Sequence, residues 1–255
     1  MAVAFVAQIG TAQDKVASMS QVITTTAAAA AGSLVVLAIA LDPTSVGLTI
    51  TISDSAGGNT WTLAGNVTNG SGTAGVRSHI FASKLTNGIA NGGTITFSFN
   101  TNVTAKASVA LNYSGADNAE DVAAGTGTGN STTPTASLTP TLPDDLLVGV
   151  VGREGPTGDA AGTNDADTAG GASWVQRTSI GTSGGAAASN IGAGYVNPAA
   201  TATVVSDKIT TSAAAQTYNP TLGTSRLWAE VLVTFKATVT FDPATVADVF
   251  GLDEE

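Results

Sequence analysis

The chain has 255 residues, a net charge of -10 and no cysteine. Without cysteine it can form neither disulfides nor thiolate metal sites. With 9 basic residues against 19 acidic ones, it lacks the positive footprint that nucleic acids and anionic membrane surfaces attract. Charged residues make up 11% of the chain and hydrophobic ones 43%, so threonine, serine, asparagine and glycine must form much of the surface. Such a neutral surface favours a protein that packs among copies of itself or faces outward from an assembly.

The N-terminal segment and the longest apolar run bear on export. Residues 1–10 have no basic group ahead of a short apolar stretch, so we expect no signal peptide. The apolar run at residues 34–41 is far shorter than the roughly 20 residues that span a bilayer, so we expect no transmembrane segment. A β-rich protein without an export signal is typical of components that are released by lysis, as virion components are.

Alternating apolar and polar residues predict a series of short strands in the first part of the chain. Residues 48–53 alternate leucine and isoleucine with threonine and serine, and a turn cluster follows before Trp61 opens the next strand. The alanine-rich run at residues 27–32 is interpreted as a loop or strand edge, because threonines precede it and Gly32 ends it. The strands predicted in this part lie at residues 21–26, 34–41, 48–53, from Trp61 onward, 76–85, 94–99 and 109–114.

The same order of segments returns in the second part of the chain. Residues 145–151 match 33–39, 172–174 match 59–61, 191–195 match 80–84, and 228–235 match 106–113. Counted at Leu34/Leu146, Trp61/Trp174, Ile80/Ile191 and Ala107/Ala229, the separations are 112, 113, 111 and 122 positions. Three near-equal separations and a longer one indicate a repeated strand order with one insertion before Trp228. Duplication and a shared bias toward alanine, threonine and glycine both stay open as the origin of the match.

Many short strands at even spacing, with no convincing interior helix, predict an all-β fold. We expect a jelly-roll-like antiparallel β-sandwich with a duplicated strand order, in halves of about residues 20–115 and 140–237. The Thr-, Gly- and Pro-rich segment 116–143 is interpreted as a long surface connection, although its composition also fits a domain boundary. We favour one domain over residues 1–237, because seven phenylalanines and three tryptophans must serve the whole chain.

Residues 238–255 show the signals of a short helix or tail. Asp242 can cap such a helix, Pro243 fits its first turn and Gly251 can end it. In one interpretation this segment packs on its own sandwich or frays. In the other its apolar face docks into a neighbouring subunit, because an apolar face must be buried somewhere. The residues predicted to dock are Phe241, Val246, Val249 and Phe250.

Candidate catalytic and metal-binding residues are few. His79 is the only histidine and lies in a predicted strand with no nucleophile elbow in the chain, so a structural or surface role is favoured over a triad. The acidic loops at residues 164–167 and 117–121 lack the full ligand set of a calcium loop, and solvated loops are favoured. Asp54 precedes a glycine pair, where aspartate commonly accepts backbone hydrogen bonds in a turn. We predict no catalytic residue, no metal and no cofactor.

Three tryptophans are candidate ligand-binding residues. Trp61, Trp174 and Trp228 would stack on sugar rings if they were exposed. Each lies at the edge of a predicted strand among apolar residues, so core positions are favoured.

Four segments resemble a β-sandwich module of bacteriophage virion proteins and some bacterial surface proteins. They are residues 32–36, 54–61, 92–96 and 110–115. In that group an Asp-x-x-Gly-Asn-x-Trp turn recurs and a Tyr-Ser-Gly strand end follows. This chain departs from the pattern with two glycines before Asn59. The resemblance covers roughly residues 20–237, and its motifs mark the fold rather than a chemistry, so no functional residue is carried over.

The resemblance implies tail, fibre or head-decoration proteins, or carbohydrate-binding modules. We therefore expect a non-enzymatic virion structural protein, displayed on the capsid or tail, whose partners are other virion proteins and copies of itself. The alternative is a carbohydrate-binding or adhesion module that binds a cell-surface glycan. A hydrolase is least favoured, since it would need a pair of carboxylates in a cleft.

Overall fold

The computed structural model describes residues 2–154, 174–178, 180–182, 205–210, 213–222 and 225–238. Within these residues the chain forms fifteen strands and one turn of 3-10 helix at Gly72–Ala74. Every pairing between strands is antiparallel, which confirms the predicted all-β sandwich. This part of the chain contains no helix long and apolar enough to cross a membrane. The predicted C-terminal helix, with Phe241, Val246, Val249 and Phe250, lies outside the described residues.

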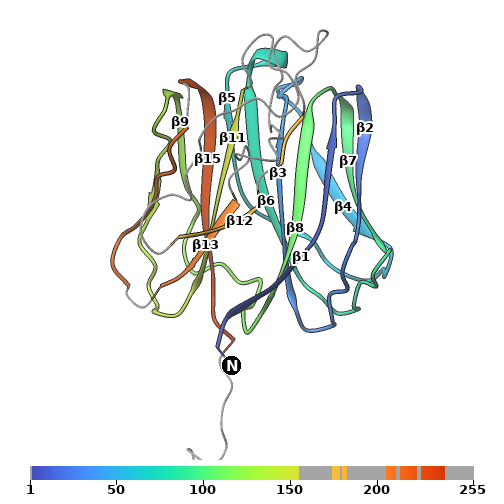
Figure 1. Cartoon of the computed structure of the whole chain (residues 1–255), viewed down its shortest axis with the longest axis vertical. Coiled ribbons are helices and arrows are strands. Elements are labelled where there is room, and N and C mark those ends of the chain that lie inside the picture. Colours follow the sequence, from blue (N-terminus) through green and yellow to red (C-terminus); the bar gives the residue numbers. More distant parts are fainter. Residues whose placement is uncertain are drawn as a thin grey trace, which may run out of the picture.

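The first half of the chain forms two sheets (Figure 1). The inner sheet has the order β1-β8-β3-β6-β5 and the outer sheet the order β2-β7-β4. The first strand lies beside the eighth and the second beside the seventh, as in the double Greek key of a jelly roll. The inner strands are β1 (Ala4–Asp14), β3 (Leu34–Leu41), β5 (Thr62–Asn69), β6 (Val76–Lys84) and β8 (Lys106–Ser114). The outer strands are β2 (Ser18–Thr24), β4 (Ile50–Asp54) and β7 (Thr94–Val103).

The second half repeats this plan with a smaller outer sheet. Its inner sheet has the order β9-β15-β11-β13-β12, and its outer sheet pairs β10 with β14. The inner strands are β9 (Gly125–Ser131), β11 (Leu146–Arg153), β12 (Val175–Thr178), β13 (Val205–Ile209) and β15 (Arg226–Phe235). The outer strands are β10 (Ala136–Leu138) and β14 (Gln216–Tyr218).

The two inner sheets agree strand for strand. The strand order of one inner sheet corresponds to that of the other, position by position. The equivalent strands are β1 and β9, β8 and β15, β3 and β11, β6 and β13, and β5 and β12. The register agrees too. Leu34 lies opposite Tyr113 and Lys84, and the equivalent Leu146 lies opposite Phe235 and Ile209. The predicted repeat of the strand order is therefore confirmed.

Two details of the sequence prediction need correction. Residues 191–195 lie outside the described residues, and the strand in the place of β6 is β13 instead. The register makes Lys84 equivalent to Ile209, so the extra residues of the second half lie between Trp174 and β13. The segment 116–143 is also more than a surface connection, because it contains β9 and β10.

Buried side chains fill three layers between the four sheets. One layer lies inside each half, and the third lies between the two inner sheets, in the space that we call the seam. The seam includes Leu34, Val36 and Ala38 of β3 and Leu146, Val148 and Val150 of β11. Because each inner sheet is covered on both faces, every residue of β3 and β11 is buried. This explains why residues 34–41 form a continuous apolar run instead of an alternating one.

Hydrogen bonds also join the two halves across the seam. The Ser78 hydroxyl donates to the Ala229 carbonyl over 2.9 Å and accepts from the Gly152 N–H over 3.0 Å. The Asn69 amide donates to the carbonyls of Gly129 and Trp228 over 2.7 and 2.9 Å. The single domain over residues 1–237 stays a prediction, which separate production of the two halves would test.

In the part of the chain that the structure describes, irregular pairing occurs in strand pairs that include an edge strand. Register shifts interrupt the pairs β1–β8, β5–β6, β2–β7 and β12–β13, and each of these pairs includes an edge strand. The central pairs β3–β6, β3–β8 and β11–β15 are continuous. The shifts mark bulges, which bend and twist an edge strand.

Candidate functional site

The turn after β4 is held by the carboxylate of Asp54. One oxygen, Oδ1, accepts the N–H groups of Ala56 and Gly57 at 3.0 Å each, and Oδ2 accepts the Trp61 indole N–H at 2.8 Å. Gly57 and Gly58 have φ of 68° and 73°, in the left-handed region that side chains disfavour. The predicted turn role of Asp54 is confirmed.

Asn59 ties this turn to the one between β6 and β7. Its Oδ1 accepts the N–H groups of Thr86 and Asn87, and its Nδ2 donates to the Asn87 carbonyl, all over 2.9 Å. Nδ2 also donates to both oxygens of Asp54 at 3.2 Å. The polar groups of the Asp-Asn-Trp motif are therefore used within the fold.

The tryptophans are likewise engaged inside the protein. Trp174 and Trp228 are 7% and 4% exposed, and their indole N–H groups donate to the Thr217 carbonyl and the Ser131 hydroxyl, both over 3.0 Å. Trp61 is half-buried and packs against the first-half core. Of the three predicted ligand-facing aromatics, only Trp61 is not fully buried.

His79 lies in the core of the first half. It is 3% exposed and stacks on Phe81 with ring centroids 5.7 Å apart. Burial, with a smaller effect from the Arg77 charge, lowers the pKa of His79 to about 3, so the imidazole is neutral. These observations fit the structural role that the sequence favoured.

The acidic loops have separate outcomes. Residues 164–167 lie outside the described residues. In the other loop, Asp117 accepts the N–H of Asn118, and Asp121 accepts from the backbone and the hydroxyl of Thr141. Across the described ranges, no three His, Asp or Glu side chains gather as a metal site.

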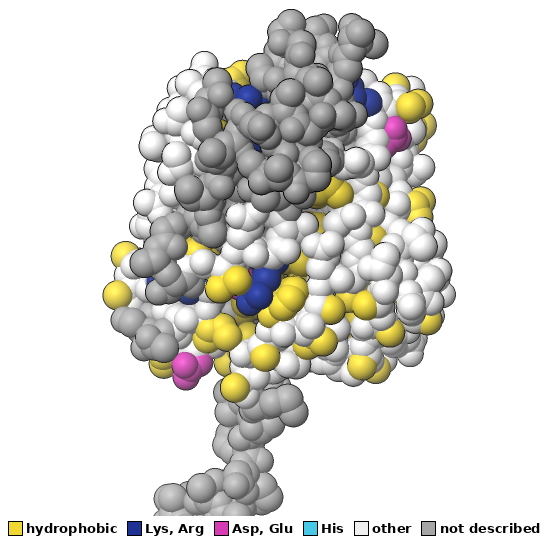
Figure 2. Space-filling view, viewed as in Figure 1, with side chains coloured by type: hydrophobic (Ala, Val, Ile, Leu, Met, Phe, Trp, Pro, Cys, Tyr) yellow, Lys and Arg dark blue, Asp and Glu magenta, His cyan; other side chains and the backbone are white. Residues whose placement is uncertain are grey.

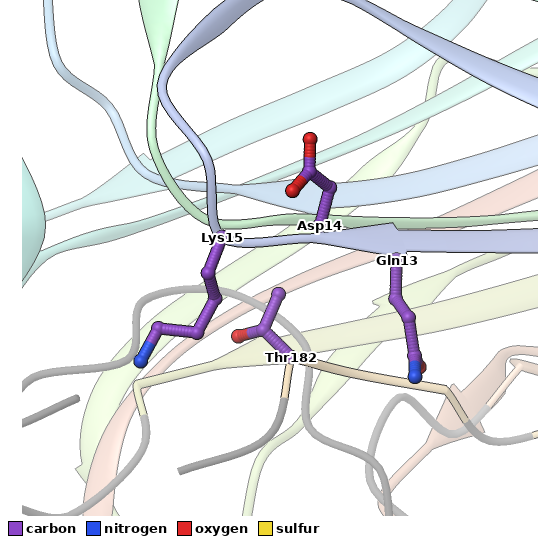
Figure 3. A pocket seen from close by; sticks show the side chains of 4 residues that line it. All are labelled: Gln13, Asp14, Lys15 and Thr182. Carbon is purple, nitrogen blue, oxygen red and sulfur yellow. The ribbon is translucent and has the colours of Figure 1, made fainter. Parts of the chain in front are cut away.

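A polar hollow lies where β1 of the first half faces the segment after β12 of the second half. It has a volume of about 220 Å³, and Gln13, Asp14, Lys15 and Thr182 line it. Figure 3 shows Gln13 and Lys15 on the side of the strand that faces Thr182, and Asp14 directed the other way. Amide, ammonium and hydroxyl groups offer donors and acceptors that suit a small polyhydroxy ligand.

A buried lysine fixes one wall of this hollow. The ammonium of Lys106, whose side chain is fully buried, pairs with Asp14 over 3.1 Å and donates to the carbonyls of Val16 and Val103. Three donors thus meet three acceptors, which is the full capacity of an ammonium group. The segment that carries Gln13 and Lys15 is therefore held firmly.

One acid follows the central strand of each inner sheet. Asp42 follows β3 and Glu154 follows β11. Burial raises the pKa of Asp42 to about 7, while an Ala105 hydrogen bond and the charges of Lys15 and Lys106 act in the opposite direction. Burial raises the pKa of Glu154 to about 9; the charge of Asp42 adds to this effect and that of Arg226 opposes it.

A smaller groove of about 130 Å³ lies between β1 and the strands β12 and β13. Arg177 lies 4.0 Å over the Phe5 ring and pairs with Asp207 at 2.8 Å, so one guanidinium joins both halves. Figure 2 views this face and shows few charged side chains, with hydrophobic ones gathered in its lower part. The large hydrophobic residues exposed on these strands are Val6, Val175 and Ile209.

Comparisons with protein-family models, curated proteins and solved structures found no match. The geometry and the sequence resemblance are therefore what bears on function.

Sequence reasoning missed the polar hollow and the acid pair. The hollow joins residues 13–15 to Thr182, and only tertiary packing brings these segments together. The acid pair had a signal, since Asp42 and Glu154 are separated by the 112 positions that separate Leu34 from Leu146.

Proposed function

We propose that the chain is a non-enzymatic structural protein of a bacteriophage virion, an accessory displayed on the capsid or the tail. One observation carries the proposal. The motif by which the chain resembles virion β-sandwich modules forms its hydrogen bonds within the protein. Asp54, Asn59 and Trp61 bond to one another and to the neighbouring turn. Residues that serve the fold in this way fit a scaffold whose task is to hold a shape.

The surface supports the same proposal. Charged residues make up only 11% of the chain, and the face of β1, β12 and β13 exposes Val6, Val175 and Ile209. A neutral face with apolar side chains suits contact with other virion proteins or with copies of the chain. The seam, with its shared core and hydrogen bonds, would keep the two halves in a fixed relation under load.

The proposal is tested on purified particles from the source. Mass spectrometry should find the protein in them, and immunogold labelling should place it over heads or over tails. Deleting residues 241–255 should leave the fold intact and abolish incorporation if the tail docks. Protein found only free or on cells would contradict the virion role, and full loading of the deletion variant would contradict docking by the tail.

A carbohydrate-binding module is the second candidate, and the polar hollow is the observation that favours it. A sugar bound there would contact Gln13, Lys15 and Thr182. Screening the protein against a glycan array should give binding that Gln13→Ala and Lys15→Ala each weaken by roughly tenfold, the effect of losing about 1.4 kcal/mol. Equal binding by the variants would remove the hollow as the sugar site.

A further inference from the structure

Asp42 and Glu154 occupy the same position in the two halves. Each directly follows the central strand of its inner sheet, β3 or β11. Each also makes the same backbone hydrogen bond, from Asp42 N–H to the Ala105 carbonyl at 2.9 Å and from Glu154 N–H to the Leu227 carbonyl at 2.8 Å. The repeat therefore places one carboxylic acid from each half at equivalent points.

Both acids face the seam. Two residues earlier on each strand stand Ala40 and Gly152, and a Cβ added to Gly152 would lie 2.9 Å from the Cβ of Ala40. Side chains two residues apart on a strand point to the same face. The carboxyl groups therefore lie near the point where Ala40 of β3 packs against Gly152 of β11, and the charge of Asp42 acts on Glu154.

Three carboxylate oxygens of this pair are shielded from solvent without a hydrogen-bond partner among the described residues. Asp42 is fully buried; its Oδ2 accepts the Ala105 N–H at 3.1 Å, and its Oδ1 has no donor there. Neither Oε1 nor Oε2 of Glu154 has a donor in the same part of the chain. Buried polar atoms are nearly always satisfied by protein, water or an ion, and leaving them unmet is costly.

We propose that Asp42 and Glu154 together bind a divalent cation of the hard, oxygen-preferring class, with Ca²⁺ as the best fit. Carboxylates are preferred ligands of Ca²⁺, which accepts irregular shells that waters and carbonyl groups complete. Bound across the seam, the ion would join the first half to the second. Lys15, Lys106 and Arg226 bring positive charge near the pair, so we expect modest affinity, with Kd on the order of 10⁻⁴ M.

The test is calcium binding by the whole chain after chelator treatment, under mildly alkaline conditions. Isothermal titration calorimetry with Ca²⁺, and separately with Mg²⁺, should show one site. At about a hundredfold excess over Kd, Ca²⁺ should raise the Tm by about 5 °C. Asp42→Asn and Glu154→Gln should each abolish the calcium-dependent rise in Tm. In Asp42→Asn the amide oxygen can still accept the Ala105 N–H, so this variant keeps the hydrogen bond that the Asp42 side chain makes.

Glu230→Gln is the matched control. Glu230 is also fully buried, but it lies on β15 rather than at the end of β3 or β11, and this variant should keep the full calcium response. The proposal fails if the wild type binds neither ion, or if Asp42→Asn and Glu154→Gln both keep wild-type affinity. If one of the two does not fold, the other decides alone, because each removes one ligand.

Discussion

The two halves build the same strand order around different interiors. In the first half the outer strands β2, β4 and β7 are 7, 5 and 10 residues long, and aliphatic and phenylalanine side chains fill the core beneath them. In the second half the described outer strands β10 and β14 have 3 residues each. There the rings of Trp174, Tyr218 and Trp228 take up much of the space.

One pair of equivalent positions shows how a ring in the second half takes the place of an aliphatic side chain in the first. Leu37 of β3 is fully buried in the first-half core, and 112 positions later the chain has Gly149 on β11. A Cβ at Gly149 would overlap the ring of Tyr218. An aromatic ring from the outer sheet thus replaces the side chain that the inner sheet supplies in the first half. The comparison teaches that strand order tolerates opposite ways of filling a core, provided that the volume is filled.

The largest expected effect on stability comes from substitutions at Tyr218 and Gly149. Tyr218→Ala should lower the free energy of unfolding by about 3–5 kcal/mol, because it empties the layer that the ring fills. Gly149→Leu should cost about 3 kcal/mol or more through overpacking. Urea unfolding of each variant measures both values.

The double variant sharpens the comparison. Combining Gly149→Leu with Tyr218→Ala should cost less than the sum of the single changes, because the leucine enters the space that the ring leaves. Strict additivity would show that Tyr218 does not substitute for the missing side chain. Leu37→Ala serves as the first-half reference, with an expected cost of about 2–5 kcal/mol.

Glu230 gives the second half a dependence on pH. Burial raises the pKa of Glu230 from 4.5 to about 9, so the folded protein favours the protonated acid. Its contribution to stability is therefore complete below pH 4.5 and is lost as the pH rises toward 9. Between pH 4.5 and neutrality the free energy of unfolding of the wild type should fall by about 3 kcal/mol relative to that of Glu230→Gln. Denaturant midpoints measured across this pH range check the prediction. If the midpoints of the wild type and of Glu230→Gln change equally with pH, the prediction is wrong.

Ser78 tests whether the halves unfold together. Ser78→Ala removes both hydrogen bonds of its hydroxyl across the seam and leaves the Gly152 N–H buried, which should cost about 2 kcal/mol. We expect the calorimetric transition to broaden or divide as the halves lose coupling. Ser83→Ala is the matched control on β6, since the Ser83 hydroxyl is buried with no partner in the described residues, and it should be close to neutral.

The smallest effect is expected at the first-half turn. Asn59→Ala should cost about 1 kcal/mol, because its hydrogen bonds to Thr86 and Asn87 lie near the surface and water can replace them. Hydrogen exchange should rise at the N–H groups of both residues. Unchanged exchange there would mean that the link between the turns is not needed to hold them.

The sequence predicts those strands whose pattern of apolar and polar residues reflects which side chains are buried. Alternation located β4 and β7, a continuous apolar run located β3, and the recurring segments indicated the repeated strand order. It could not reveal β9, which has no hydrophobic residue. Gly129 is required there because a Cβ would lie 2.6 Å from the ring of Trp228. Backbone pairing to β15, rather than side-chain burial, defines that strand.

The candidate sites divide in the same way. The turn role of Asp54 follows from local chemistry, because the N–H groups that donate to its carboxylate lie within a few residues. The polar hollow depends on which distant segments pack together, and no local pattern records that. The placement of Asp42 and Glu154 lies between these cases, since the repeat supplies their equivalence and only the packing of Gly152 against Ala40 places their strands side by side.

The bulged edges of the sheets bear on how such a protein survives at high concentration. An open edge strand presents unpaired N–H and C=O groups that can recruit the edge of another molecule. Here β1, an 11-residue edge strand, carries two register shifts, and the edge strands β5 and β12 carry one each. Twisted edges of this kind resist the continuous sheet-to-sheet pairing that leads to aggregation. The edges formed by β1, β5 and β12 would therefore resist edge-to-edge pairing between crowded molecules, whereas the edges at β4 and β9 are regular.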